Sequence, residues 1–399
     1  MKQNKGFIKG ALFGALTVLL VMAILSCGMK LAGGIKDKNQ SDSREVVGKS
    51  EETKITLLKT LIDRYYRGDV DDEALQEGLY KGYIEALNDP YSAYYDEEET
   101  KELNEAITGE FCGIGALMSQ DKSTGLITIV QVYENSPASE AGLKEKDVLY
   151  KVDGKDILDK SLNEVVNKVR GEEGTTVELT VLRGEDGDEI TMTATRRVIQ
   201  THTVESQVLE GDIGVLSVSE FGAVTKEQYK TALEELENQG IQGLIVDLRG
   251  NPGGSLDVVV DILDEMLPEG MIVSVKDKDG KVEEYTSDDE HQFRKPLVVL
   301  ADGNSASASE IYAGAIQDYG IGQIVGTQTY GKGVVQQIYD LKDGSCVKLT
   351  IAEYLTPKGR SIDGEGITPD VEVEYERDEN RPDYDNQMEK AWELIKSQL

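Results

Sequence analysis

The sequence places three serines at alternate positions just before a predicted helix. Residues 304–310 read Asn-Ser-Ala-Ser-Ala-Ser-Glu. An apolar run over residues 296–301 predicts a buried strand, and residues 308–319 predict a helix that stops at Gly320. The first N–H groups of a helix have no intrahelical partner, so they can stabilise a developing oxyanion. A serine at this junction is therefore a candidate nucleophile.

Lys332, in the Gly-Lys-Gly of residues 331–333, is a candidate base for such a serine. A lysine that is removed from water can lose its proton near neutral pH. A structural interpretation competes with this one. Ser307 and Glu310 have the spacing of a capping box, in which each side chain satisfies a backbone donor. A lysine between glycines is also typical of a turn, and spacing alone does not choose among the three serines.

The joint pattern resembles the C-terminal processing peptidases, also called tail-specific proteases. The likeness covers residues 50–375 and rests on motifs at residues 247–254, 305–311, 317–318, 330–333, 336, 356–362 and 366–370. The resemblance implies a serine endopeptidase in which Ser307 is the nucleophile, Lys332 is the base and Gln336 orients the lysine. It also implies an oxyanion hole built from backbone groups of Gly253, Gly254 and Ala308.

The two histidines, His202 and His291, belong to no recognisable serine-hydrolase signature. A Ser–Lys dyad needs no histidine. Lys332 and Gln336 are four residues apart, which on a strand would put both side chains on one face. Residues 334–339 have the β-branched composition of such a strand. The sequence has no cluster with zinc-ligand spacing, and we expect neither a metal nor a cofactor.

Residues 108–198 change to short strands, glycine turns and one helix over residues 162–169, a pattern that resembles a PDZ domain. Gly113, Ile114 and Gly115 would then form the carboxylate-binding loop. Consecutive backbone N–H groups make a nest for a terminal carboxylate, and the bound peptide adds a strand beside it. A Gly-x-Gly by itself is also typical of a tight turn. The expected partners are protein or peptide substrates with exposed apolar C-termini.

Strands and helices alternate over residues 199–375, which predicts an α/β core. With the family resemblance, the predicted fold is a multidomain α/β protein with a crotonase-like or ClpP-like layered protease core, an inserted PDZ domain and an N-terminal helical segment. The predicted division is an anchor or signal at 1–29, a linker at 30–50, the helical segment at 51–107, the PDZ domain at 108–198, the core at 199–375 and a C-terminal helix at 376–399. In the family the helical segment can contribute to dimer contacts, so a homodimer and packing within one chain are both expected alternatives.

The N-terminus carries Lys2, Lys5 and Lys9, followed by the uncharged and mostly apolar residues 11–29. This stretch is long enough to span a bilayer, and the lysines predict a cytoplasmic N-terminus. We therefore expect a single-pass protein of the cell membrane with an extracytoplasmic catalytic body. A cleaved signal peptide is a competing interpretation. A lipid anchor at Cys27 is a third, because the residues before it weakly resemble a lipoprotein cleavage site.

The formal net charge of −33 makes nucleic acid and anionic membrane surfaces poor partners, and solubility is its plainest explanation. Beyond Cys27, the remaining cysteines are Cys112 and Cys346. They fall in different predicted domains, so two buried thiols are expected in preference to a disulfide.

The predicted function is a membrane-tethered serine endopeptidase that cleaves protein substrates from or near their C-terminal ends. The alternative is a non-catalytic PDZ module that binds the same tails. A crotonase-like acyl-CoA enzyme is a weaker third hypothesis, because it gives the PDZ region and Lys332 no role.

Overall fold

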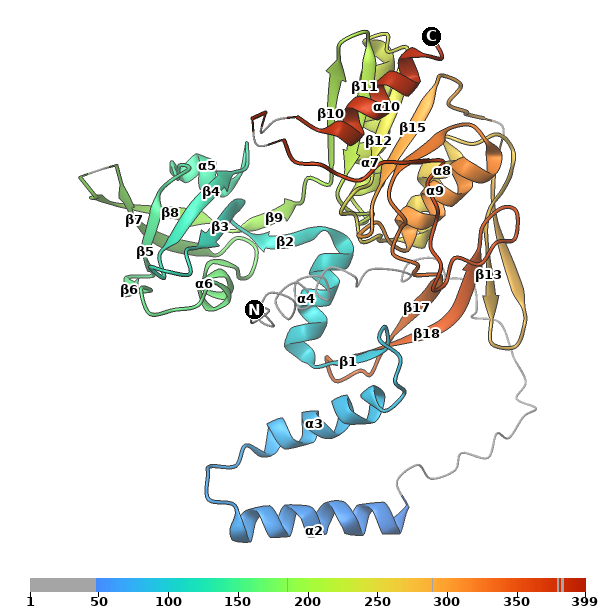
Figure 1. Ribbon diagram of the computed structural model, residues 1–399. Helices are drawn as coiled ribbons and strands as arrows, with labels where there is room; N and C mark the ends of the chain where they lie inside the picture. The colour runs from blue at the N-terminus through green and yellow to red at the C-terminus, as the bar shows by residue number, and fades with distance from the viewer. Residues whose placement is uncertain (1–47, 185, 289, 379, 382–383) are drawn as a thin grey trace.

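The computed structural model describes residues 48–399 except 185, 289, 379, 382 and 383. Its core consists of a central sheet, a second sheet and helices between and around them (Figure 1). An inserted unit of strands and short helices, residues 110–200, extends to one side of the core. Three helices precede both parts: α2 (Lys49–Tyr65), α3 (Asp72–Glu85) and α4 (Glu97–Thr108).

The central sheet has the strand order β10-β11-β12-β15-β16-β19. Its neighbours are parallel except for the antiparallel pair of β10 and β11. All five residues of β15 are buried, which agrees with the apolar run that predicted this strand. The strands are β10 (Val204–Leu209), β11 (Ile213–Val218), β12 (Gly243–Asp247), β15 (Leu297–Ala301), β16 (Gln323–Gly326) and β19 (Val371–Glu372).

Side chains of the central sheet alternate between two hydrophobic cores, one on each face. Leu297 and Val299 of β15 join the larger core, to which three helices contribute: α7 (Thr225–Asn238), α8 (Leu256–Asp264) and α9 (Ala308–Tyr319). Val298 and Leu300 join the smaller core, together with Ile395 of α10 (Asn386–Lys396). The C-terminal helix thus covers the second face of the sheet, a partner that the sequence did not reveal.

The second sheet is antiparallel and joins the N-terminal part of the chain to the core. Helix α9 contacts both β16 of the central sheet and β13 of this one, so the helix lies between the two sheets. Strand β1 pairs with β18 at the edge of the second sheet, far from it in sequence. The strands are β1 (Ala93–Tyr95), β13 (Gly270–Asp277), β14 (Val282–Ser287), β17 (Val334–Asp340) and β18 (Cys346–Leu355).

The inserted unit has its own sheet, in the order β3-β4-β5-β7-β8, and its own hydrophobic core. The chain enters and leaves it through an antiparallel ribbon of β2 (Glu110–Gly113) and β9 (Arg197–Gln200). The helix predicted at residues 162–169 is confirmed as α6. The other elements are β3 (Ala116–Gln120), β4 (Ile127–Val132), α5 (Pro137–Ala141), β5 (Val148–Val152), β6 (Lys155–Asp156), α6 (Leu162–Val169), β7 (Thr176–Arg183) and β8 (Asp188–Thr195).

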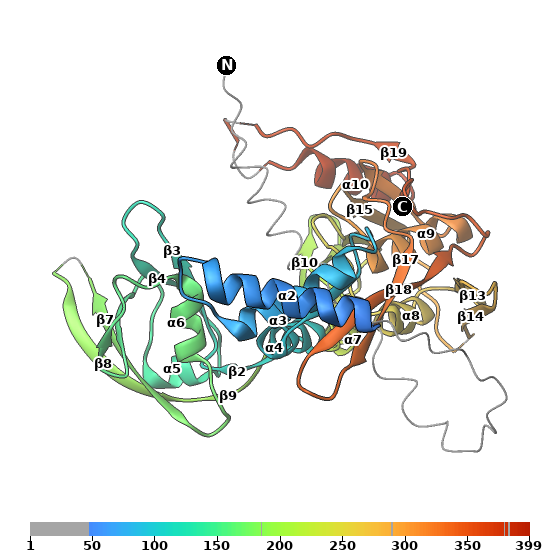
Figure 2. The ribbon, with the colours of Figure 1, turned by 90° about the horizontal axis from the view of Figure 1, so that it is seen from below.

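Helices α2 and α3 lie at the lower end of the molecule, with α2 outermost (Figures 1 and 2). Neither contains a residue that is buried in the described chain, and apolar side chains such as Leu58 and Leu79 are exposed. Helix α4 is different, because it contacts both the core and the inserted unit. Its Glu105 accepts from Arg170 Nη1 at 2.5 Å, at the end of α6.

The structure contradicts the predicted membrane span. In the part of the chain that it describes, no helix is long and apolar enough to cross a bilayer. The predictions of a transmembrane helix, a membrane anchor and a single-pass membrane location are therefore corrected. Residues 11–29, on which those predictions relied, lie outside the described residues.

Cys112 and Cys346 are both free thiols, as expected. Cys346 is buried and accepts a hydrogen bond from Thr100 Oγ1 at 3.3 Å. Cys112 is only half-buried, so the prediction of two buried thiols is right for one of them.

Candidate active site

The structure distinguishes the three serines that the spacing could not. Ser305 and Ser309 are each 1% exposed, and their hydroxyls donate to the carbonyl oxygens of Leu248 (2.7 Å) and Asn251 (3.0 Å). These two serines hold the turn after β12 against the start of α9. Ser307, by contrast, is half-buried and lines a pocket.

Ser307 adopts an unusual backbone conformation, with φ +55° and ψ −114°. A residue other than glycine is strained there, and such strain persists only where the surroundings enforce it. Ser307 is the N-cap residue of α9, and its N–H donates to the Glu310 carboxylate at 2.9 Å, as in the expected capping box. Glu310 N–H also donates to the Ser307 carbonyl oxygen at 2.8 Å, so the main chain of Ser307 provides an acceptor for the first turn. The conformation leaves the hydroxyl available to the pocket.

The Glu310 carboxylate connects this turn to the loop that carries Lys332. It is fully buried, and it accepts from Ser307 N–H (2.9 Å), Lys332 N–H (2.8 Å), Gly331 N–H (2.7 Å) and Thr329 Oγ1 (2.6 Å). Burial raises the pKa of the Glu310 carboxyl, and the hydrogen bonds counter this rise. The sequence suggested only a capping box here, so the connection between the two loops was missed.

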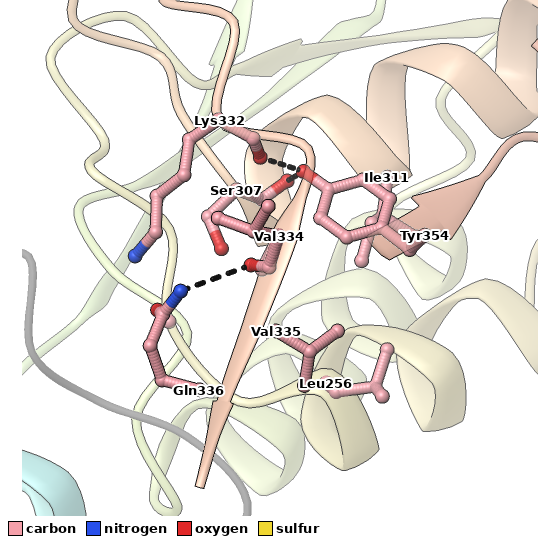
Figure 3. A pocket seen from close by; sticks show the side chains of 10 residues that line it. Leu256, Ser307, Ile311, Lys332, Val334, Val335, Gln336 and Tyr354 are labelled. Atoms are coloured by element: carbon pink, nitrogen blue, oxygen red, sulfur yellow. Dashed lines mark hydrogen bonds between the residues drawn. The ribbon is translucent and has the colours of Figure 1, made fainter. Parts of the chain in front are cut away.

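Lys332 lies in the loop before β17 and is 3% exposed. Burial lowers its pKa from 10.5 to about 8, although the negative charges of Glu310 and Asp89 act in the opposite direction. The Tyr354 hydroxyl fixes the main chain on both sides of the site. Its single O–H proton is shared between the carbonyl oxygen of Ser307, at 3.0 Å, and that of Lys332 (Figure 3). No sequence motif pointed to Tyr354.

Gln336 and Lys332 line the same pocket, but not for the reason that the spacing suggested. Lys332 precedes β17, which begins at Val334, and the pairing of β17 with β18 has an irregularity between Val335 and Gln336. The simple alternation of a strand therefore does not relate the two side chains. Gln336 is 9% exposed, and its amide group donates to Thr350 Oγ1 at 3.4 Å.

The pocket encloses about 30 Å³, room for a group the size of a water molecule. Figure 3 shows the side chains of Ser307, Lys332 and Gln336 directed toward one space beside β17. The lining residues combine these polar groups with an apolar wall: Gly254, Leu256, Ser307, Ala308, Ile311, Lys332, Val334, Val335, Gln336 and Tyr354.

The glycine turn expected to form the oxyanion hole packs directly on the serine turn. A Cβ atom on Gly253 would lie 2.6 Å from the Ala306 carbonyl oxygen and 2.8 Å from Ser307 Cβ, so a side chain has no room there. Gly253 N–H donates to Asn251 Oδ1 at 2.8 Å and is thus engaged. Gly254 and Ala308 both line the pocket, and Ala308 is the first residue of α9.

The two histidines lie away from this pocket. His202 is exposed, and its ring is 5.8 Å from that of Tyr133. His291 Nδ1 contacts the Glu265 carbonyl oxygen at 2.6 Å. In the described part of the chain, no group of three or more His, Cys, Asp or Glu residues is arranged to hold a metal ion.

The glycine loop of the inserted unit also has a defined geometry. Gly113 ends β2 and pairs with Arg197 of β9. The carbonyl oxygens of Ile114 and Gly115 accept from Ala138 N–H (2.8 Å) and Tyr133 N–H (3.0 Å). In a trans peptide the carbonyl group and the N–H group of the following residue point in opposite directions. Because the Ile114 and Gly115 carbonyl groups face α5 and the end of β4, the N–H groups of Gly115 and Ala116 point away from these elements.

Gly115 is required at its position for two reasons. Its φ is +75°, which L side chains rarely adopt, and a Cβ atom there would lie 2.5 Å from Ser136 Cβ.

Three parts of the chain match known families. Residues 212–373 match peptidase family S41, and residues 128–183 match a PDZ domain. Residues 11–100 match the N-terminal domain of the activating protease CtpB.

Whole-chain relatives agree with these matches. The chain is 39% identical to the probable CtpA-like serine protease of Staphylococcus saprophyticus over 84% of its own length and 67% of the relative's. It is 34% identical to the carboxy-terminal processing protease CtpA of Bacillus subtilis, over 92% of this chain and 77% of that one. A photosystem II D1 C-terminal processing protease structure aligns with 80% of this chain and 86% of its own, at 28% identity and a TM-score of 0.48.

The Staphylococcus saprophyticus and Bacillus subtilis relatives are 39% and 34% identical to this chain at the aligned positions, and the alignments cover at least 67% of each relative. The pocket around Ser307 lies within the S41 match, and the glycine loop lies just before the PDZ match. This chain belongs to peptidase family S41 and is a C-terminal processing serine protease with a PDZ domain.

Proposed function

We propose that this protein cleaves peptide bonds with a Ser307–Lys332 dyad. The observation that carries the proposal is that a strained serine and a buried lysine line one pocket, with their backbones joined by Glu310. Gln336 lines the same pocket, which supports its role in orienting the lysine. The neutral Lys332 amine takes the proton of the Ser307 hydroxyl as its oxygen attacks the scissile carbonyl carbon.

The tetrahedral oxyanion would be stabilised by the N–H groups of Gly254 and Ala308. We propose Gly253 as the spacer that lets the two turns meet, because its own N–H donates to Asn251. When the intermediate collapses, the Lys332 ammonium gives its proton to the leaving amine. The neutral Lys332 amine then deprotonates a water molecule, whose oxygen attacks the carbonyl carbon of the acyl-enzyme ester. The bond from that carbon to Ser307 Oγ breaks, and the Lys332 ammonium returns its proton to the serine oxygen.

We also propose that the PDZ domain binds apolar C-terminal tails. Its β3 lies at one end of the strand order, and the N–H groups of Gly115 and Ala116 point away from the rest of the domain. A peptide could add to this edge beside α6, with its terminal carboxylate on those N–H groups. The partly buried Met118 and Leu162, on β3 and α6, support a preference for apolar residues.

The layered core supports a crotonase-like or ClpP-like relationship, because α9 lies between two sheets with the nucleophile at its first turn. The homodimer stays a prediction.

The dyad predicts that Ser307→Ala and Lys332→Ala each abolish proteolysis, with a loss of at least about 1,000-fold in kcat/KM. Removing either residue leaves no nucleophile or no base. Cleavage of fluorescently labelled casein measures the loss, and circular dichroism checks that each variant is folded. Turnover at the wild-type rate by either folded variant would refute the dyad. Abolition by both variants would exclude the non-catalytic alternative.

The buried lysine predicts the pH dependence of activity. Its pKa of about 8 means that the amine is mostly protonated below pH 8 and neutral above it. Because only the neutral amine can accept a proton, kcat/KM should rise with pH through about 8, with one ionisation and a tenfold fall per pH unit below it. The control is the double variant His202→Gln/His291→Gln. A limb near pH 6.5 that disappears in this variant would indicate a histidine base instead.

Glu310→Gln should lower kcat/KM by about 100-fold, because the two loops of the site would lose their shared acceptor. The amide has one acceptor oxygen and a donor group that would face N–H groups, so donors of the two loops would be left unsatisfied. The matched control is Glu237→Gln, which removes a carboxylate that pairs with Lys295 on the surface. Equal activity and equal melting temperature in both variants would show that Glu310 does not organise the site.

The PDZ proposal predicts that peptide binding depends on a free C-terminal carboxylate. Fluorescence anisotropy with Ser307→Ala protein, which would leave the peptide intact, measures the affinity for peptides of about eight residues that end in valine. Amidation of the terminus should weaken binding at least tenfold, because the N–H groups of the loop would lose their anion. Replacing the final valine by aspartate should weaken it similarly. Equal binding of free and amidated peptides would contradict this role for the loop.

A further inference from the structure

The segment between α3 and α4 reaches the candidate active site from a distant part of the chain. We call residues 89–95 the strap. Its β1 portion pairs with β18, with Ala93 opposite Lys348. Ser92 fixes the turn before it, since its hydroxyl donates to Asp89 Oδ2 at 2.5 Å and accepts from Thr350 N–H at 3.0 Å. The strap is therefore held on the second sheet by backbone pairing and by a side chain.

The strap places an aromatic ring on Lys332. The Tyr91 ring centroid is 4.9 Å from Lys332 Nζ. Lys332 is 3% exposed, although it lines a pocket that also contains the half-buried Ser307. Figure 3 shows the Lys332 side chain extending toward the space that Ser307 and Gln336 also face. The Tyr91 ring is thus one of the groups that lie close to this nearly unexposed amine.

The strap also contacts β18, the strand that pairs with the strand of Gln336. Thr350, whose N–H donates to Ser92, lies opposite Gln336 in the pairing of β17 and β18. The Gln336 amide group donates to Thr350 Oγ1 at 3.4 Å. The strap therefore contacts Lys332 directly through Tyr91, and it is linked to Gln336 through Thr350.

We propose that Tyr91 is a positioning residue for proteolysis, whose ring shields the amine of Lys332 from water and keeps it able to accept the Ser307 proton. This inference rests on the proposed function, in which Lys332 is the base.

Two properties of the ring act in opposite directions. The face of an aromatic ring attracts a cation and favours the ammonium form, whereas the exclusion of water disfavours it. Burial is the largest influence on Lys332 and lowers its pKa, so we expect the shielding to dominate. The charged and titratable groups around the lysine and the ring come from several elements: Glu310 on α9, Asp89 on the strap, Lys348 on β18, and Tyr330 and Asp363 in loops. These groups stay in place when only the ring is removed.

The test compares the pH dependence of kcat/KM for full-length wild type, Tyr91→Ala and Tyr91→Phe. Loss of the ring should move the acidic limb upward by about one pH unit, so that Tyr91→Ala is roughly tenfold less active at pH 7 and recovers at high pH. Tyr91→Phe keeps the ring and should keep the wild-type limb. Tyr83→Ala on α3, where the tyrosine is 64% exposed, is the matched control and should change nothing. An unchanged limb in Tyr91→Ala, or a downward shift, would overturn the inference.

A second measurement separates this inference from the dyad itself. In Ser307→Ala protein, the ionisation of Lys332 is followed by ¹³C NMR of labelled lysine, with Lys332→Met used for assignment. Adding Tyr91→Ala to this protein should raise the pH at the Lys332 titration midpoint by about one unit, as in the activity profile. If the midpoint does not move while Lys332→Ala is inactive, the shielding role fails and the dyad stands. If Lys332→Ala is active, the dyad fails. Should Tyr91→Ala not fold, Tyr91→Leu is expected to shift the midpoint in the same direction by less, and no shift would overturn the inference.

Discussion

The buried carboxylate of Glu310 is the contact on which the geometry of the candidate active site depends. Ser307 lies in the loop that leaves β15 of the central sheet, and Lys332 lies in the loop that leads into β17 of the second sheet. Glu310 accepts from the backbone of both loops and thereby fixes their separation. A buried carboxylate is stable only when its lone pairs are satisfied, and here four donors satisfy them. The arrangement is rigid because the Tyr354 hydroxyl ties the carbonyl groups of the same two residues.

Much of the fold could be read from the sequence, because its patterns reflect local physics. The continuous apolar run of β15 indicates a strand buried on both faces, and the structure confirms it. The helix that begins at Ala308 ends at Gly320, where φ is +69°, as the glycine stop signal indicated. The inserted domain and its single longer helix were also recognisable. The face that α10 covers was not, because an amphipathic helix shows only that one side is buried. The predicted membrane span is contradicted by the helices that the structure describes.

The parts of the site that the sequence could not give are those that depend on long-range contacts. Ser305 and Ser309 differ from Ser307 because the turn after β12 buries their side chains. The alternate spacing of the three serines gives no information about this burial. Lys332 and Gln336 line one pocket, as the sequence suggested, but an irregularity in the pairing of β17 with β18 separates them, so the regular alternation of a strand does not explain it. The contact of Tyr91 with Lys332 depends on the pairing of β1 with β18, two strands that are far apart in the sequence.

The ribbon of β2 and β9 has a consequence for how the two halves of the protein depend on each other. Glu110 pairs with Gln200, and Thr201 N–H donates to the Gly109 carbonyl oxygen at 2.8 Å. The chain therefore enters and leaves the PDZ domain at one place, through two paired strands, and the contact of Glu105 on α4 with Arg170 lies outside this ribbon. Forming this ribbon closes the loop made by residues 110–200, and closing a loop costs conformational entropy. That entropic cost grows only slowly with the number of residues in the loop. Insertions within the PDZ domain can thus alter what it binds while leaving the core's own strand order intact.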